Sequence, residues 1–210
     1  MTRLTILLVL LTNLSFGQTD LDYHLYSQVL NDYINEGVKY DVKTTEVVII
    51  TKYAPDENEA SAYGEDFLDD DEKTINMVLH YDTMKIRLFK DEKVKNALKQ
   101  LENEFFETPS LDKTKFNLTP TVSTITNGQF EGYFKTIFGR RTDKGWKKFY
   151  KKHPGSHGAF EFSKVVYADN YACFYVGRHT NGLSGSGDIV IARRLNGEWN
   201  IVISVNIWIS

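Results

Sequence analysis

The first hydrophobic segment of the chain is continuous, whereas the later ones are periodic. It runs from Leu4 to Leu14 with few polar interruptions, after the basic residue Arg3. Ser15-Phe16-Gly17 follows and places small residues three before and one before a cut at Gln18. This order is typical of a secretory signal peptide, and the run is shorter than the roughly 20 apolar residues that span a bilayer. We therefore predict a signal peptide over residues 1–17 and a periplasmic or secreted mature protein with no membrane span.

Periodic apolar positions then predict a helix followed by a strand. Between a capping Asp20 and Gly37, apolar residues recur near helical spacing. Residues 46–53 contain the run Val47-Val48-Ile49-Ile50, which is typical of a buried strand. Residues 55–74 are dense in Asp and Glu and poor in large apolar groups, so we expect a mobile acidic loop there.

The middle of the chain combines helical and ambiguous patterns. Residues 93–106 carry an apolar stripe on one helical face, and residues 121–126 predict a short strand. Asn127 and Asp143 are suited to cap two further helices. Residues 76–89 stay ambiguous, although an alternation at Met84, Ile86 and Leu88 could continue a strand.

The last fifty residues give the clearest pattern, four strands joined by short connections. The strands are expected at 160–167, 171–179, 188–195 and 199–209. Asn196-Gly197 between the last two is a strong hairpin signal, because a type I′ turn needs positive φ at both central positions. We predict an α+β fold, with helices packed on one face of a C-terminal antiparallel four-stranded meander. No linker divides the chain, so residues 18–210 are expected to form a single domain.

Composition narrows the classes of function. The chain has 28 acidic and 25 basic residues and a formal net charge of −3, which gives no support for nucleic-acid binding. Cys173 is the single cysteine, so the monomer has no internal disulfide. A buried and inert thiol is expected there, because Cys173 lies within a predicted strand between Ala172 and Phe174.

A series of motifs in the C-terminal third carries a family resemblance. They are the Trp146-Phe149-Tyr150 helix, the step from His153 to Gly158, Phe162-Ser163, the loop Gly182-Leu183-Ser184-Gly185-Ser186-Gly187, and Asn196-Gly197 with Trp199 and Trp208. In this order they resemble a family of uncharacterised exported proteins from Bacteroidota. Relatives carry a Cys pair where this chain has Thr180 and Ser184, so the resemblance implies no disulfide or metal role for that pair. The resemblance implies a shared fold and an exported location, and it does not imply any activity.

The glycine-rich loop and the histidines are candidates for phosphate or metal binding. A phosphate loop needs a strand, then glycines, then a helix, whereas strands are predicted on both sides of residues 180–187. His153, His157 and His179 could form an open metal site if they converge. Pro154 and Gly155 separate the first two, and separate surface histidines are the favoured interpretation. We therefore predict no metal and no cofactor.

Nucleophilic catalysis is the alternative that would make this chain an enzyme. Ser184 and Ser186 lie in the glycine-rich loop, with His157 and His179 near in sequence. A serine hydrolase needs a base within hydrogen-bond reach of the nucleophile, an orienting acid and an oxyanion hole. The sequence supplies these residue types and no nucleophile-elbow motif.

A ligand pocket between helices and sheet is the favoured alternative. Phe130, Phe134, Trp146 and Tyr150 lie on the inner faces of two predicted helices and are expected to line it. The leading hypothesis is therefore an exported, non-enzymatic domain that binds a small molecule or a protein. A hydrolase with a Ser/His pair near the glycine-rich loop is the second.

Overall fold

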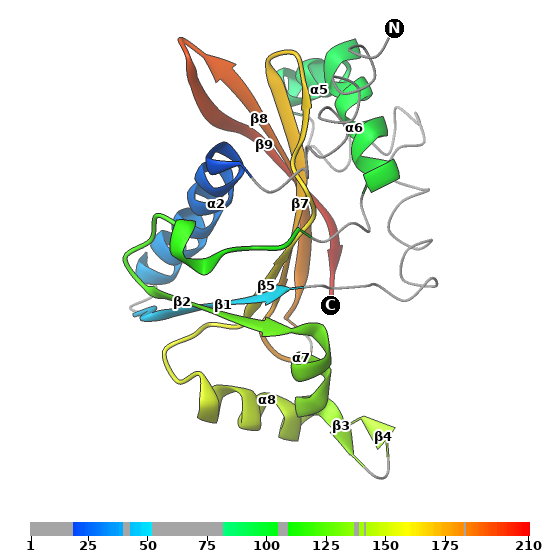
Figure 1. Ribbon diagram of the computed structural model, residues 1–210. Coiled ribbons are helices and arrows are strands. Elements are labelled where there is room, and N and C mark those ends of the chain that lie inside the picture. Colours follow the sequence, from blue (N-terminus) through cyan, green and yellow to red (C-terminus); the bar gives the residue numbers. More distant parts are fainter. Residues whose placement is uncertain are drawn as a thin grey trace, which may run out of the picture.

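One mixed β-sheet forms the centre of the molecule and carries helices on both faces (Figure 1). The computed structural model describes residues 19–39, 43–51, 82–104, 109–136, 139–140, 142–182 and 184–210. The predicted signal peptide, residues 1–17, and the predicted acidic loop, residues 55–74, lie outside this part of the chain and stay predictions.

The sheet has the strand order β2-β1-β5-β7-β8-β9, and β6 pairs with β7. β1 is parallel to β2 and to β5, whereas the remaining neighbours are antiparallel. A separate two-stranded ribbon joins β3 to β4. The bounds are β1 Glu46–Thr51, β2 Thr121–Thr126, β3 Lys135–Thr136, β4 Gly139–Arg140, β5 Ala159–Phe162, β6 Val166–Ala168, β7 Tyr171–His179, β8 Ser186–Leu195 and β9 Glu198–Ile209.

The predicted α+β class is confirmed, but the prediction of a purely antiparallel four-stranded sheet was wrong. The C-terminal strands do pair in antiparallel order, and β1 and β2 extend them with parallel strands. The cause lies in residues 47–50, which are all at most 1% exposed. A strand that is apolar on both faces needs cover on both faces and neighbours on both edges, which a place inside the sheet provides.

The prediction that the helices pack on one face of the sheet was also wrong, because the helices cover both faces. Helix α2 packs on one face, where Leu25, Tyr26 and Leu30 contact the side of the sheet that carries Val47 and Phe174. The bounds of the helices are α2 Asp20–Lys39, α5 Thr83–Phe89, α6 Glu92–Glu104, α7 Asn127–Phe134 and α8 Thr142–Lys152, with a 3₁₀ turn η1 at Lys113–Lys115.

The opposite face carries two separate groups of helices. Val94 and Leu98 of α6 pack with Cys173 and Ile191. Helices α7 and α8 pack instead around Val48 and Ile50 of β1, together with Ala159. Alternate residues of one strand thus face α2 and these helices in turn, which follows from the two-residue period of a strand.

Local sequence explains where several elements begin and end. The Thr126 hydroxyl accepts a hydrogen bond from the Gln129 N–H, and the Gln129 amide oxygen accepts one from the Thr126 N–H, which makes a capping box that starts α7. Asn196 and Gly197 have φ of 53° and 91°, so the predicted hairpin between β8 and β9 is confirmed.

Two segments differ from the expected elements. Residues 83–89 form helix α5, since the Asp82 carboxylate accepts the Lys85 N–H at 3.1 Å and caps the first turn. The strand expected at 160–167 is split into β5 and β6. Its break lies at Ser163, whose hydroxyl accepts the Tyr175 N–H at 2.8 Å in place of a backbone carbonyl.

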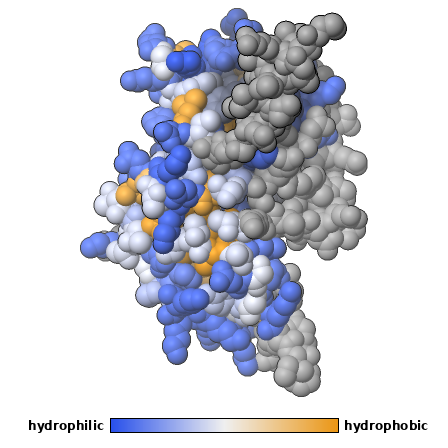
Figure 2. Space-filling view, in the orientation of Figure 1, coloured by the Kyte–Doolittle hydropathy of each residue, from blue (hydrophilic) through white to orange (hydrophobic). Residues whose placement is uncertain are grey.

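The surface seen in Figure 2 is mainly hydrophilic, with small hydrophobic patches near its middle. Within the described ranges, no helix has the length and apolar character needed to cross a membrane.

Candidate functional site

The four serine and histidine candidates occupy different places near one end of β7 and β8. His157 precedes β5, and its Nε2 lies 3.5 Å from the Lys43 carbonyl. His179 ends β7, with Nε2 at 3.3 Å from Glu161 Oε1. Ser184 is exposed, and its carbonyl accepts a hydrogen bond from the Thr180 hydroxyl. Ser186 begins β8.

Ser186 and His179 project from opposite faces of the sheet. Ser186 lies opposite Arg178 in the β7–β8 register, so its side chain shares the face of Arg178. The Ser186 side chain lies near the Tyr33 hydroxyl of α2 there. His179 follows Arg178 directly and faces the other way, toward Phe130 and Trp208. The fold therefore does not bring this serine and this base together.

The four aromatic candidates pack on one another. Phe130, Phe134 and Trp146 are buried, with ring centroids 5.1 to 5.9 Å apart. Tyr150 stacks on Trp146 at 5.6 Å, and its hydroxyl donates to the Thr180 carbonyl. These contacts make the aromatic faces of α7 and α8 the core of that layer.

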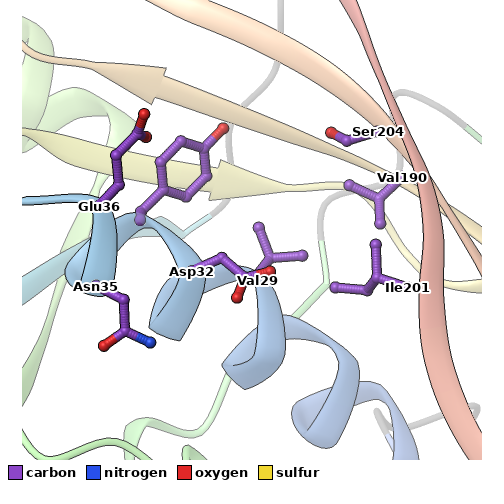
Figure 3. A pocket seen from close by; sticks show the side chains of 8 residues that line it. Val29, Asp32, Asn35, Glu36, Val190, Ile201 and Ser204 are labelled. Atoms are coloured by element: carbon purple, nitrogen blue, oxygen red, sulfur yellow. The ribbon is translucent and has the colours of Figure 1, made fainter.

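A hollow of about 420 Å³ lies on the other face of the sheet, between the C-terminal half of α2 and strands β8 and β9 (Figure 3). Its apolar residues are Val29, Val190 and Ile201, of which Val29 and Val190 are buried. Tyr33 and the exposed residues Asp32, Asn35, Glu36 and Ser204 complete the lining. The volume is within the range of small-molecule sites, roughly 300 to 1,000 Å³.

A polar network holds Tyr33 in place beside the hollow. The Tyr33 hydroxyl donates to Asp188 Oδ2 at 2.7 Å, and Asn206 Nδ2 donates to Asp188 Oδ1 at 3.1 Å. The guanidinium of Arg178 lies 5.3 Å from the centre of the Tyr33 ring. Burial, and next the negative charge of Asp188, raise the pKa of Tyr33, so the phenol stays neutral and donates at physiological pH.

A second polar group is buried on the face opposite the hollow. Trp208 Nε1 donates to the Tyr175 hydroxyl at 3.0 Å, and that hydroxyl donates to Glu161 Oε1 at 3.1 Å. Glu161 is 2% exposed, and its Oε2 atom has no hydrogen-bond partner among the described residues. We name Trp208, Tyr175 and Glu161 the Glu161 group.

Sequence reasoning missed both of these sites. Asp32 and Glu36 look like an ordinary solvent-facing pair on an amphipathic helix, four residues apart. A usable signal for the Glu161 group was Gly177 inside a predicted strand, since an isolated strand glycine indicates close approach of another group. A Cβ at Gly177 would meet both the Glu161 carboxylate and, at 2.6 Å, the Tyr175 hydroxyl.

In the described part of the chain, no three His, Cys, Asp or Glu side chains are grouped so that they could hold a metal ion. No family model, curated protein or solved structure matches this chain.

Proposed function

We propose that this chain is an exported, non-enzymatic domain that binds a small ligand in the hollow between α2, β8 and β9. The observation that carries the proposal is the hollow itself, about 420 Å³ in volume with buried apolar residues inside and polar residues at its rim. Apolar walls with a few placed polar groups are the usual composition of a small-molecule site.

The location of this site differs from the one first expected. The aromatic side chains of α7 and α8 contact one another closely, so their surface is already used in packing. At α2, by contrast, the side chains of Val29 and Val190 face each other across the hollow (Figure 3). The proposal keeps the predicted class of function and moves the ligand to the opposite face of the sheet.

The serine hydrolase alternative has less support than ligand binding. Ser186 and His179 lie on opposite faces, and Ser186 lies on the face that carries Tyr33. Ser184 belongs to an exposed loop. Neither serine is seen with the base and orienting acid that acyl transfer requires.

Export of the protein is part of the proposal and rests on the sequence. Residues 1–17 have the order of basic start, apolar run and small residues that signal peptides share. The resemblance of the C-terminal motifs to exported Bacteroidota proteins agrees with it. In a periplasmic or extracellular location, the protein would bind a ligand that is present outside the cytoplasm.

A fragment screen followed by NMR tests the binding site. We expect fragments that bind to shift the methyl signals of Val29, Val190 and Ile201 together. Ser204→Trp should weaken these fragments at least tenfold, because Ser204 is exposed at the rim and an indole there would occupy the hollow.

The matched control is Asn200→Trp, which places the same indole at an exposed position of β9 outside the lining. This variant should bind the fragments as the parent does. Fragments that shift signals elsewhere and bind Ser204→Trp with unchanged affinity would contradict the proposed site.

A further inference from the structure

The charged groups that line the hollow all have the same sign. Asp32 and Glu36 stand one helical turn apart on α2, and no Lys or Arg is among the lining residues. In the described ranges, neither carboxylate is in an ion pair with a basic side chain. The lining of the hollow therefore carries two negative charges and no positive one among the described residues.

Arg178, a basic residue on the same face of the sheet as Tyr33, is stacked on aromatic rings. The guanidinium of Arg178 lies over the rings of Tyr33 and Phe160, at 5.3 and 6.0 Å from their centres. Arg178 contacts the lining residue Tyr33 but is not itself part of the lining. Asp188, which accepts from Tyr33 and Asn206, adds a further carboxylate beside the site.

The position of Glu36 in the helix strengthens this argument. Helix α2 ends at Lys39, so Glu36 lies in its last turn. The helix macrodipole is negative at that end, so a carboxylate there is disfavoured and a cation is favoured. The carbonyl end of α2 and the two carboxylates thus act in the same direction on any charge that enters the hollow.

We infer that the ligand of this hollow is a small organic cation, an ammonium group carried on an apolar body. The inference rests on the proposed function and adds the ligand class to it. The apolar body would contact Val29, Val190 and Ile201, and the ammonium group would lie at the rim near Asp32 and Glu36. An anion of the same shape would meet two carboxylates and a helix C-terminus, and would be excluded.

Three probes with one apolar body and different charges test this inference: hexylamine, hexanol and hexanoate at neutral pH. We expect hexylamine to bind about tenfold tighter than hexanol, because each of the two exposed carboxylates attracts the ammonium group modestly. Hexanoate should bind more weakly than hexanol. Raising the salt concentration should reduce the advantage of the amine, since exposed charges are screened.

Variants assign the preference to the two carboxylates. In Asp32→Asn with Glu36→Gln, hexylamine should bind no tighter than hexanol. The control is Glu102→Gln with Asp143→Asn, which removes the same net charge from exposed positions of α6 and α8 and should keep the tenfold preference.

The outcomes separate this inference from the proposed function. If hexylamine and hexanol bind with equal affinity and both lose binding in Ser204→Trp, the inferred cationic ligand is wrong and the proposed binding site is supported. Tighter binding of hexanoate would also overturn the cation. If none of the three probes binds in the hollow at any concentration, both the ligand class and the proposed site are wrong.

Discussion

The indole of Trp208 lies on the backbone of Gly187, where any other residue would place its Cβ. An added Cβ would meet Nε1 and the neighbouring ring atoms Cε2, at 2.5 Å, and Cδ1, at 2.6 Å. The two residues are paired across β8 and β9, and the same indole nitrogen donates to Tyr175. Glycine at position 187 is therefore what allows Trp208 to reach the Glu161 group.

Gly187→Ala should destabilise the fold because the methyl group and the indole cannot both keep their places. Overpacking of this kind costs typically about 1–3 kcal/mol, and we expect a loss in that range by urea unfolding. The fluorescence of Trp208 should change with it.

The control for this variant is Gly132→Ala in α7. Nothing lies within 4 Å of a Cβ at Gly132, so the change should be neutral or stabilise the helix by up to about 1 kcal/mol. If Gly187→Ala were as stable as Gly132→Ala, the close approach of Trp208 to the strand would be refuted.

The hydroxyl of Tyr175 connects Trp208 to Glu161, and Tyr175→Phe removes these two hydrogen bonds at once. Since these groups are buried or partly buried, we expect a loss of about 1–3 kcal/mol in the free energy of unfolding. Chemical denaturation monitored by circular dichroism measures it.

Tyr171→Phe serves as a comparison on the same strand and face. Its hydroxyl lies 3.4 Å from Asp91 Oδ2, which is long for a hydrogen bond, so the loss should be below about 1 kcal/mol. Equal losses in the two variants would mean that the Trp208–Tyr175–Glu161 chain contributes nothing beyond an ordinary tyrosine.

The sequence predicts a structural feature well when neighbouring residues determine it, and poorly when residues far apart in the chain determine it. The turn at Asn196-Gly197 was predictable because its φ angles are a property of those two residues. The parallel pairing of β1 with β5 was not, since Val48 and Ala159 are more than a hundred positions apart and nothing in residues 47–50 names a partner. The apolar character of residues 47–50 on both faces predicted a buried strand, but it did not show which strands lie beside it.

The same difference applies to the candidate sites. Asp32 and Glu36 become the rim of a hollow only because α2 packs across β8 and β9, a relation between segments far apart in the chain. The aromatic residues of α7 and α8 were identified as inward-facing, and the packing that uses their surfaces could be seen only once both helices were placed. Residue type predicted which side chains are buried. Whether the space beside them is filled by packing or stays a hollow is decided by tertiary contacts.

The signal peptide prediction is tested by the mature N-terminus. Expression of the full chain in a bacterial host should give an exported protein that begins at Gln18, since Ser15 and Gly17 meet the need for small residues before the cut. N-terminal sequencing of the periplasmic or secreted fraction measures this. Exported protein that still begins at Met1, or that begins well beyond Asp20, would contradict the prediction.

The thiol of Cys173 should be unreactive in the folded protein. Burial raises the pKa of Cys173 from 9.0 to about 12, and the thiolate is the reactive form of cysteine. We expect no modification by Ellman's reagent at neutral pH and complete modification after unfolding in guanidinium. Modification of the folded protein at the rate of the unfolded chain would show that the residue is accessible.

The same shift links stability to alkaline pH. A group whose pKa is higher in the folded than in the unfolded state contributes stability that is fully present below its unfolded pKa, here 9.0, and is lost as pH rises toward the folded value of about 12. Tyr26 and Tyr33, whose pKa values burial also raises, act in the same direction above the ordinary tyrosine value of 10.0. The midpoint of urea unfolding should therefore fall steadily above pH 9. In Cys173→Ala the fall should begin closer to pH 10, the ordinary value of the tyrosines. An unchanged onset would show that Cys173 does not contribute.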